Sequence, residues 1–182
     1  MAAPVAAQES VYFAQLCSRS GALRHTGDER EGDEDLGDGD DEIIVIDLNK
    51  VPRDVVALVC IATVATEGRT FADVKTSKMR LVDWKTGTER CRYYPGSVGA
   101  HTALFMCRLA RSGGGWTMQT IGGTDHTARD WGTLVPEIKT YCADLVPGFK
   151  DAALKYPDER IAIMRKGGHV RLRDYCGTFP PP

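Results

Sequence analysis

One segment of the sequence is so dense in acidic residues that it limits how the chain around it can pack. Residues 28–42 read DEREGDEDLGDGDDE, with ten carboxylates and one arginine, so their local net charge is −9. The whole chain of 182 residues has a net charge of −2, which leaves +7 on the other 167 residues. Two carboxylates about 5 Å apart repel by roughly 1 kcal/mol even in water. The segment therefore either stays solvated or folds around a cation.

Glycines are distributed among these acidic residues, at Gly27, Gly32, Gly37 and Gly39. Glycine permits the positive-φ turns that fold a short chain back on itself, so the carboxylate oxygens can converge. Calcium takes about six to eight oxygen ligands, whereas zinc and copper favour imidazole or thiolate. The composition favours calcium if a metal ion binds. The alternative interpretation is a disordered acidic linker, and the composition leaves both open.

Two known calcium motifs do not fit this segment. An EF-hand loop that started at Asp38 would place Ile43 at its sixth position, where the loop needs glycine, and the other possible frame fails as well. Residues 37–43 match one calcium repeat of a β-helix, but such a solenoid needs several copies. Strand-like sequences over residues 11–16 and 43–48 flank the segment instead. This placement is typical of a structured loop between two strands.

The rest of the chain contains short apolar segments separated by turn signals. The pattern predicts strands over residues 55–64, 79–84, 89–94, 101–110 and 116–121, with turns at residues 85–88 and 112–115. Strands do not alternate with long helical patterns, so a parallel α/β fold is excluded. The even spacing of short strands is typical of an all-β sandwich.

Toward the C-terminus the hydrophobic period becomes helical. The apolar residues at helical spacing are Leu134, Ile138, Cys142 and Leu145. They predict a helix behind Thr133 as N-cap, which the VPG sequence at residues 146–148 ends. Beyond it, the pattern predicts a second short helix over residues 149–156 and a hairpin that joins residues 160–164 to residues 169–173.

Several motifs match one known signature. They are HTGD at residues 25–28, GDGDDE at residues 37–42, IDLNKVP at residues 46–52, TGTE at residues 86–89, and the segment from Thr102 to Trp116. On these motifs the chain resembles the TerD-type tellurium-resistance and stress-response family, over about residues 11–123. The family usually has a longer segment before the strand that matches residues 11–16. We therefore expect either a member of the family that has lost this N-terminal segment or a start codon that is misassigned.

The resemblance implies a calcium-binding β-sandwich and an association with resistance to tellurite and other chemical stress. It implies calcium ligands at the family's acidic positions, which are Asp28, Asp38, Asp40, Asp41 and Glu42, with Asp33 and Asp35 as weaker candidates. Together with the predicted C-terminal elements, the expected fold class is mainly β, a calcium-binding β-sandwich followed by C-terminal helices and a short terminal hairpin.

The expected domain organisation has three parts. Residues 1–10 are expected to be a disordered N-terminus. Residues 11–148 are expected to form the TerD-like β-sandwich domain, with the acidic loop at residues 27–42. Residues 149–182 are expected to be a C-terminal extension.

The sequence favours binding over catalysis. Its four histidines stand apart along the chain, at His25, His101, His126 and His169, and no phosphate-binding loop is present. We therefore expect no enzyme and assign no catalytic or cofactor-binding residue. The leading hypothesis is a calcium-binding stress-response protein, in which ion binding orders the acidic loop. The alternative is a metal-independent protein-interaction module that has lost the ion site.

Location and partners follow from composition. No apolar run approaches the roughly 20 residues of a transmembrane helix, so we expect no transmembrane segment and a cytoplasmic protein. Six cysteines without a C-x-x-C motif are expected to be small buried apolar residues. Protein partners or self-association are expected. Nucleic-acid binding is not, because the basic residues near the C-terminus lack interleaved aromatic residues.

Overall fold

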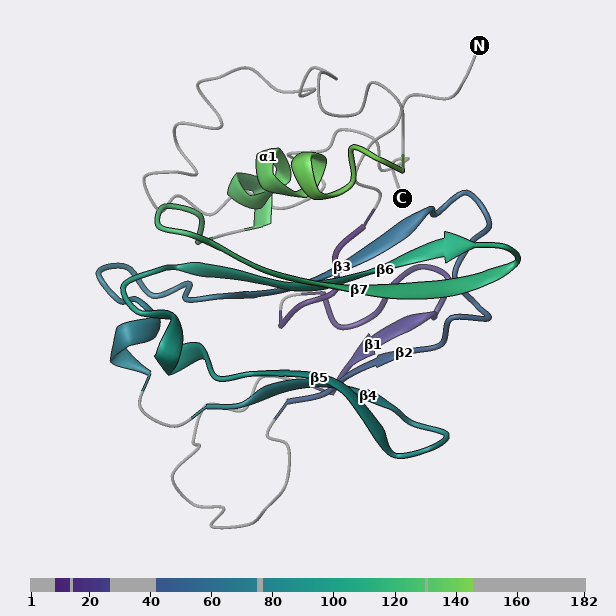
Figure 1. Cartoon of the computed structure of the whole chain (residues 1–182), viewed down its shortest axis with the longest axis horizontal. Coiled ribbons are helices and arrows are strands. Elements are labelled where there is room, and N and C mark those ends of the chain that lie inside the picture. The colour runs from purple at the N-terminus through teal and green to yellow at the C-terminus, as the bar shows by residue number, and fades with distance from the viewer. Residues whose placement is uncertain (1–8, 14, 27–41, 75–76, 130, 146–182) are drawn as a thin grey trace. The chain divides into compact units, whose positions relative to one another are not determined.

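The computed structural model describes residues 9–145, except residues 14, 27–41, 75–76 and 130 (Figure 1). The described chain divides into two compact units, residues 9–55 and residues 56–145. Within them, all paired strands are antiparallel and one α-helix is present. The mainly β prediction is therefore confirmed. The second helix and the terminal hairpin predicted within residues 149–173 lie outside the described residues.

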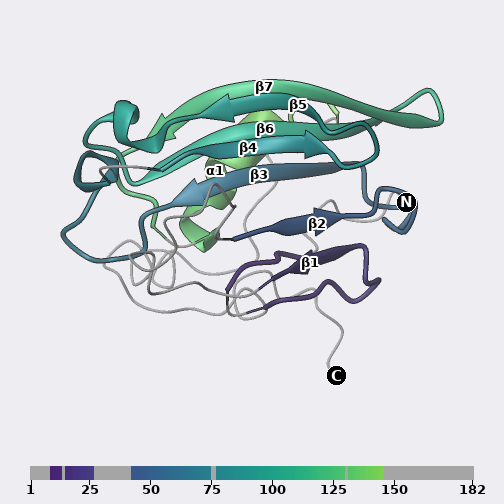
Figure 2. The same cartoon turned by 90° about the horizontal axis from the view of Figure 1, so that it is seen from below.

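The unit of residues 9–55 contains a two-stranded antiparallel sheet. Strand β1 (Leu23–His25) lies beside strand β2 (Ile44–Ile46) (Figure 2). The two strands pair so that Leu23 lies opposite Ile46 and His25 lies opposite Ile44. Strand β2 is shorter than the predicted strand of residues 43–48. It ends where the Asp47 side chain accepts a hydrogen bond of 3.1 Å from the backbone N–H of Asn49, which turns the chain.

The strand predicted over residues 11–16 is wrong. The backbones of Tyr12 and Gln15 hydrogen-bond to each other in both directions, at 3.1 and 2.8 Å, and this local turn uses the groups that an extended strand would offer to a neighbour. The Glu9 carboxylate supports the turn, because it accepts hydrogen bonds from the Gln15 side chain and from the backbone N–H of Arg19.

The unit of residues 56–145 contains a three-stranded sheet and a separate hairpin. The sheet has the order β3-β6-β7 and the hairpin is β4-β5, with β3 at Ala57–Thr63, β4 at Met79–Asp83, β5 at Thr88–Tyr93, β6 at Ala103–Ser112 and β7 at Gly115–Asp125. These strands and their two tight turns confirm the predicted pattern. Gly113 and Gly114 adopt φ of 55° and 85°, which a two-residue hairpin turn needs. Short 3-10 helices occupy Phe71–Asp73 and Pro95–Val98.

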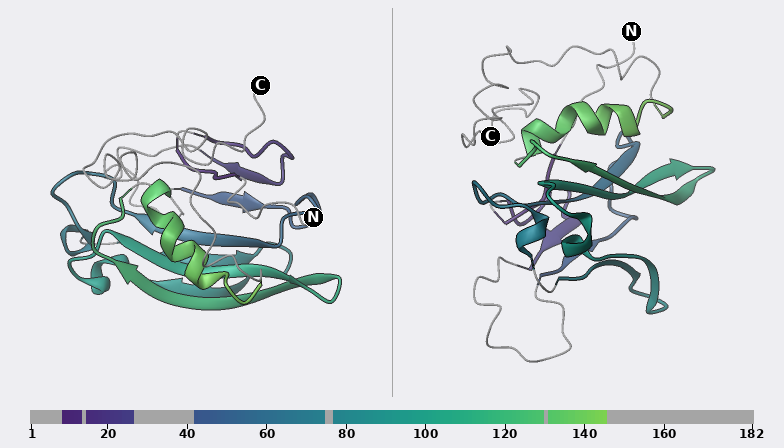
Figure 3. Two further views of the ribbon diagram at one scale, coloured as in Figure 1. Left: turned by 90° about the horizontal axis from the view of Figure 1, so that it is seen from above. Right: turned by 60° about the vertical axis from the view of Figure 1, so that its left-hand side comes forward.

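Both faces of the three-stranded sheet are covered (Figure 3). Helix α1 (Trp131–Tyr141) lies on one face, and the β4-β5 hairpin lies on the other. The helix-side core is formed by Ala103, Phe105, Ala128 and Leu134, with Val59, Ile61, Ile121, Ile138 and Tyr141 around them. The hairpin-side core is formed by Ala62, Phe71, Leu104, Met106 and Cys107, with partly buried residues from β3, β4, β5 and β7. Strand β6 supplies both cores.

A β-bulge in strand β6 changes which residues face which core. Ile61 pairs with Phe105 but its neighbour Cys60 pairs with Cys107, so Met106 is the extra residue of the bulge. Strict alternation would turn Cys107 toward the helix. The bulge instead places Cys107 in the hairpin-side core and turns Arg108 toward the end of α1, where it contacts Asp144.

Helix α1 begins earlier than predicted. Thr133 is a buried residue of its first turn rather than its N-cap, and its hydroxyl accepts a hydrogen bond of 3.3 Å from the backbone N–H of Arg129. The helix ends at Tyr141, so Leu145 lies in the turn that follows. In the part of the chain that the structure describes, no helix has the length and apolarity needed to cross a membrane.

Gly123 of β7 leaves room for the Tyr141 side chain, since a Cβ atom at this position would overlap the Tyr141 hydroxyl and lie 2.8 Å from Cζ. We predict that Gly123→Ala lowers the free energy of unfolding by about 1–3 kcal/mol, because the helix must shift away from the sheet. Chemical denaturation measures this change. Tyr141→Phe in the same chain should restore part of the loss. Gly115→Ala, on the same strand but 3.8 Å from the nearest atom, is the matched control. Equal effects of the two alanine variants would contradict the packing argument.

Candidate functional site

The two ends of the acidic segment are hydrogen-bonded to each other. The backbone N–H of Thr26 donates to the carbonyl of Ile43 at 2.9 Å, and the N–H of Ile43 donates to the Thr26 hydroxyl oxygen at 3.0 Å. These bonds extend the ladder in which His25 lies opposite Ile44. Thr26 and Ile43, which lie on either side of the acidic segment in the sequence, are therefore adjacent in the structure.

Glu42 is the one predicted metal ligand among the described residues. Its carboxylate Oε2 lies 3.7 Å from Nε2 of His25 at the base of the acidic segment, and its side chain is 42% exposed whereas that of His25 is 6% exposed. The other predicted ligands lie outside the described residues; they are Asp28, Asp33, Asp35, Asp38, Asp40 and Asp41. Glu42 follows nine carboxylates of residues 28–41 in the sequence. Together these carboxylates offer oxygen donors of the kind that hard cations prefer.

No ready-made metal centre is present elsewhere in the described residues. Outside the gaps in the structure, no three His, Cys, Asp or Glu side chains are grouped so that they could hold a metal ion. Three backbone carbonyls are grouped so that they attract a positive charge, but the cation that they bind is an arginine of the same chain. The Arg129 guanidinium donates to the carbonyls of Val64, Thr66 and Arg69 at 3.1, 2.7 and 2.6 Å.

The structure brings together two histidines that are far apart in the sequence. The rings of His101 and His126 stack, with centroids 4.1 Å apart and an interplanar angle of 23°. Each Nδ1 lies within hydrogen-bonding distance of a carbonyl, that of Val98 at 2.9 Å and that of Ala100 at 3.3 Å. A carbonyl only accepts, so Nδ1 carries the hydrogen in both rings. No sequence pattern predicts this pair, because the two residues meet only when β6 and β7 pair.

Asp125 fixes the turn that follows β7, next to this histidine pair. Its carboxylate accepts hydrogen bonds from the backbone N–H groups of Thr127 and Ala128 at 2.6 and 2.7 Å, and from the Thr127 hydroxyl at 3.0 Å. Burial raises the pKa of Asp125, but these hydrogen bonds outweigh it and the pKa is lowered below its usual value of 3.8.

A polar pocket of about 340 Å³ lies between the sheet and the end of α1, lined by Arg108, Gln119, Thr120, Ile121, Thr140, Tyr141 and Asp144. Arg108 donates to the Asp144 carboxylate and to the carbonyl of Tyr141. This ion pair lowers the pKa of Asp144. The Arg108 side chain is therefore committed to holding the end of the helix against the sheet.

The sequence of this fold corresponds to a known domain. Residues 4–128 match the TerD domain. This match covers more than half of the 182 residues, and the chain belongs to the TerD domain family. The acidic segment and the strands β1 to β7 lie within the matched residues.

Several curated relatives are about one third identical to this chain. Tellurium resistance protein TerZ of Serratia marcescens is 35% identical over 114 residues, which cover 63% of this chain and 56% of TerZ. Stress response protein SCP2 of Bacillus subtilis (strain 168) is 34% identical over 122 residues, 64% of this chain and 60% of SCP2. Tellurium resistance protein TerD of an Alcaligenes species is 33% identical over 116 residues, 62% of this chain and 59% of that protein. The chain thus spans less than two thirds of the length of each relative.

We predict that Thr26→Val opens the base of the acidic segment, because the Ile43 amide loses its side-chain acceptor. A lost hydrogen bond of about 1 kcal/mol corresponds to a roughly fivefold faster hydrogen exchange of the Ile43 amide. Exchange measured by NMR tests this. Thr26→Ser retains the hydroxyl and should exchange like the wild type. An unchanged exchange rate in the valine variant would show that the hydroxyl does not hold the two ends together.

We predict a pH-dependent contribution of Asp125 to stability. Because its pKa is lowered in the folded state, its charge stabilises the fold above the unfolded pKa, near 3.8, and this contribution is lost as the pH falls through the folded pKa. Asp125→Ala should lower the free energy of unfolding by about 1–3 kcal/mol at neutral pH. Asp125→Asn keeps an acceptor oxygen without the charge. The difference between the wild type and this variant, measured by denaturant titration, should shrink below about pH 4. A difference that does not change with pH would contradict the assignment.

Proposed function

We propose that this TerD-domain protein is a cytoplasmic, calcium-binding stress-response protein that acts by binding rather than by catalysis. The observation that carries the proposal is the pairing of Thr26 with Ile43, which closes the acidic segment at its base. The segment between these paired ends contains nine carboxylates and one arginine in residues 28–41, and a cation would offset the repulsion among such charges. In the proposal, calcium binding supplies that cation and orders the loop.

The proposed ligands are carboxylates of the acidic segment. Glu42 is the proposed ligand that lies among the described residues, at the end of the β1-β2 ladder beside His25. The remaining proposed ligands are Asp28, Asp38, Asp40 and Asp41, with Asp33 and Asp35 as weaker candidates. Oxygen-only ligands favour calcium over zinc or copper, since these metals prefer nitrogen and sulfur.

The names of the relatives support the biological part of the proposal. They are described as tellurium resistance proteins and as a stress response protein. We propose a comparable stress-response role for this chain. We also propose that the two layers formed by β3-β6-β7 and by β4-β5 belong to a calcium-binding β-sandwich, in keeping with the antiparallel strands and the core between these layers.

We predict that chelator-treated protein binds Ca²⁺ saturably in isothermal titration calorimetry, and that combined substitution of Asp38, Asp40 and Asp41 by Asn abolishes the heat. Calcium at about one hundred times its dissociation constant should also stabilise the fold by about 2.7 kcal/mol, which thermal melting detects. Glu67→Gln is the matched control, because it removes an exposed carboxylate from the other unit. Binding that survives the triple substitution, or no binding to the wild type, would reject the site.

The second candidate function is a metal-independent protein-interaction module. The observation in its favour is that the unit of residues 9–55 exposes four large apolar side chains, those of Phe13, Leu16, Ile44 and Val45. Exposed large apolar side chains mark an interaction surface when they form one patch, which is the arrangement that this candidate function requires. Self-association measured by analytical ultracentrifugation separates the two functions. Association that is unaffected by calcium or chelator, in a protein that binds no calcium, supports this second candidate.

A further inference from the structure

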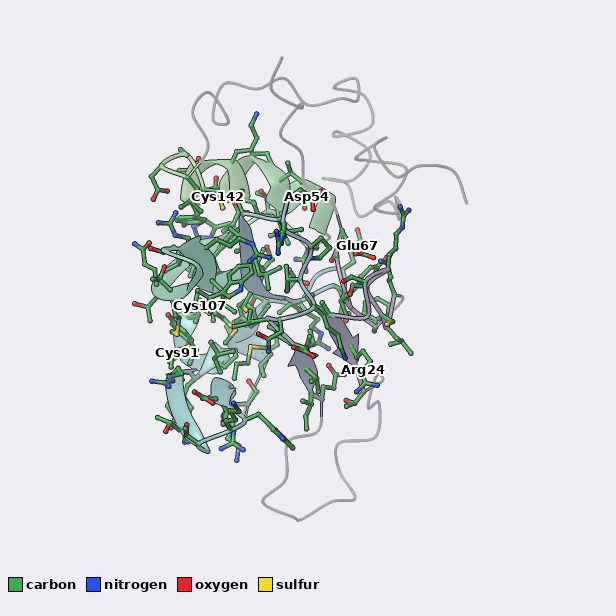
Figure 4. All side chains as sticks on the ribbon, turned by 90° about the vertical axis from the view of Figure 1, so that its right-hand side faces the viewer. Arg24, Asp54, Glu67, Cys91, Cys107 and Cys142 are labelled. Carbon is green, nitrogen blue, oxygen red and sulfur yellow. The ribbon has the colours of Figure 1, made fainter. Side chains whose placement is uncertain are left out.

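Three cysteines from three different strands meet in the hairpin-side core. Cys60 of β3 and Cys107 of β6 are paired directly across the sheet. Cys91 of β5 packs into the same cluster from the hairpin side. In Figure 4 the labelled Cys107 and Cys91 lie in this part of the unit, whereas Cys142 lies at the helix on the other face. Cys60, Cys91 and Cys107 are all free thiols.

The geometry of Cys60 and Cys107 suits a covalent bond between them. Directly opposed residues of antiparallel strands have Cα atoms about 4.5–5.5 Å apart, and disulfides join residues whose Cα atoms are about 4.4–6.8 Å apart. Both side chains point to the same face of the sheet because of the bulge at Met106. A disulfide here needs no movement of one strand past the other.

The two thiols are also chemically unequal. The hydrogen bond from the Cys107 thiol lowers the pKa of the Cys60 thiol, which outweighs the effects of burial and of Cys91. The same contact and burial raise the pKa of Cys107. Burial raises the pKa of Cys91 as well. Cys60 keeps some accessible surface whereas Cys107 has none, so Cys60 is the thiol that an oxidant reaches and Cys107 is the thiol beside it.

We propose that Cys60 and Cys107 form a reversible oxidation site, which closes to a cross-strand disulfide when the protein meets hydrogen peroxide. The Cys60 sulfur attacks one peroxide oxygen, the O–O bond breaks, and Cys60 becomes a sulfenic acid with release of water. The Cys107 sulfur then attacks the Cys60 sulfur, the S–O bond breaks, and a second water leaves. In total, two thiols and one hydrogen peroxide give one disulfide and two waters, with the thiols oxidised and the peroxide reduced.

This site goes beyond the proposed calcium function and does not depend on it, since both cysteines belong to the unit of residues 56–145. The disulfide would join β3 to β6 and close the long chain segment between them, which includes the β4-β5 hairpin. Crosslinks that close long segments restrict the unfolded chain, so the oxidised form should melt at a higher temperature. In a reducing compartment such bonds are transient and respond to oxidants.

The test is peptide mapping of the full chain after treatment with hydrogen peroxide in the presence of a calcium chelator. Free thiols are alkylated before digestion with trypsin. The digestion separates the three cysteines, because arginines flank Cys91 on both sides and the Cys60 and Cys107 peptides are residues 54–69 and 93–108. The expected product is a crosslink between these two peptides, with a raised melting temperature, both reversed by dithiothreitol.

Substitutions of single cysteines identify which two thiols form the crosslink. Cys60→Ala and Cys107→Ala should each abolish the crosslink and the rise in melting temperature, whereas Cys91→Ala and the buried control Cys142→Ala should retain both. Thermal melting of each reduced variant verifies that it is folded. If the folded wild type keeps Cys60 and Cys107 alkylatable under peroxide, the proposal is overturned. A crosslink that joins Cys91 or two separate chains would overturn it equally. Because the chelator removes calcium, a failed calcium site leaves this outcome unaffected.

Discussion

Burial of strand β6 on both faces is the constraint on which the unit of residues 56–145 depends. Ala103, Phe105 and Cys107 have no accessible surface, and alternate residues of this strand face the helix and the hairpin. A strand in this position must supply two cores at once, so its sequence is apolar almost throughout. Without the bulge at Met106, continued alternation would turn Arg108 toward the hairpin-side core. The bulge instead turns Arg108 toward the end of the helix, where it contacts Asp144.

The strands of this unit could be predicted from the sequence because local signals agree there. Apolar β-branched residues mark β3, and glycine turns separate β4 from β5 and β6 from β7. A turn such as that of Gly113 and Gly114 needs positive φ at both positions, which glycine alone adopts at no steric cost. The mainly β class of fold, the two antiparallel hairpins β4-β5 and β6-β7, and the presence of the helix follow from such patterns.

The remaining features depend on contacts that no local pattern encodes. A turn replaces the expected strand at Tyr12 because the backbones of Tyr12 and Gln15 hydrogen-bond to each other. The stack of His101 on His126 and the pairing of Cys60 with Cys107 exist only after β6 has found its neighbours, and the second also needs the bulge. For the predicted calcium site, the sequence indicated the type of ligand and the strand β2 that follows the acidic segment. The closing hydrogen bonds at its base came from the structure.

In the proposed function, the acidic segment takes up calcium. The three carbonyls around Arg129 are satisfied by a cation of the chain itself. Residues 28–41, in contrast, contain nine carboxylates and only one arginine. Two-dimensional proton–nitrogen NMR of chelator-treated protein during addition of Ca²⁺ tests this claim most directly. The account predicts saturable shifts of the amides from Thr26 to Ile43 and of the β1-β2 ladder, with the amides of β6 unchanged. An unchanged spectrum, or shifts centred on residues 56–145, would contradict it.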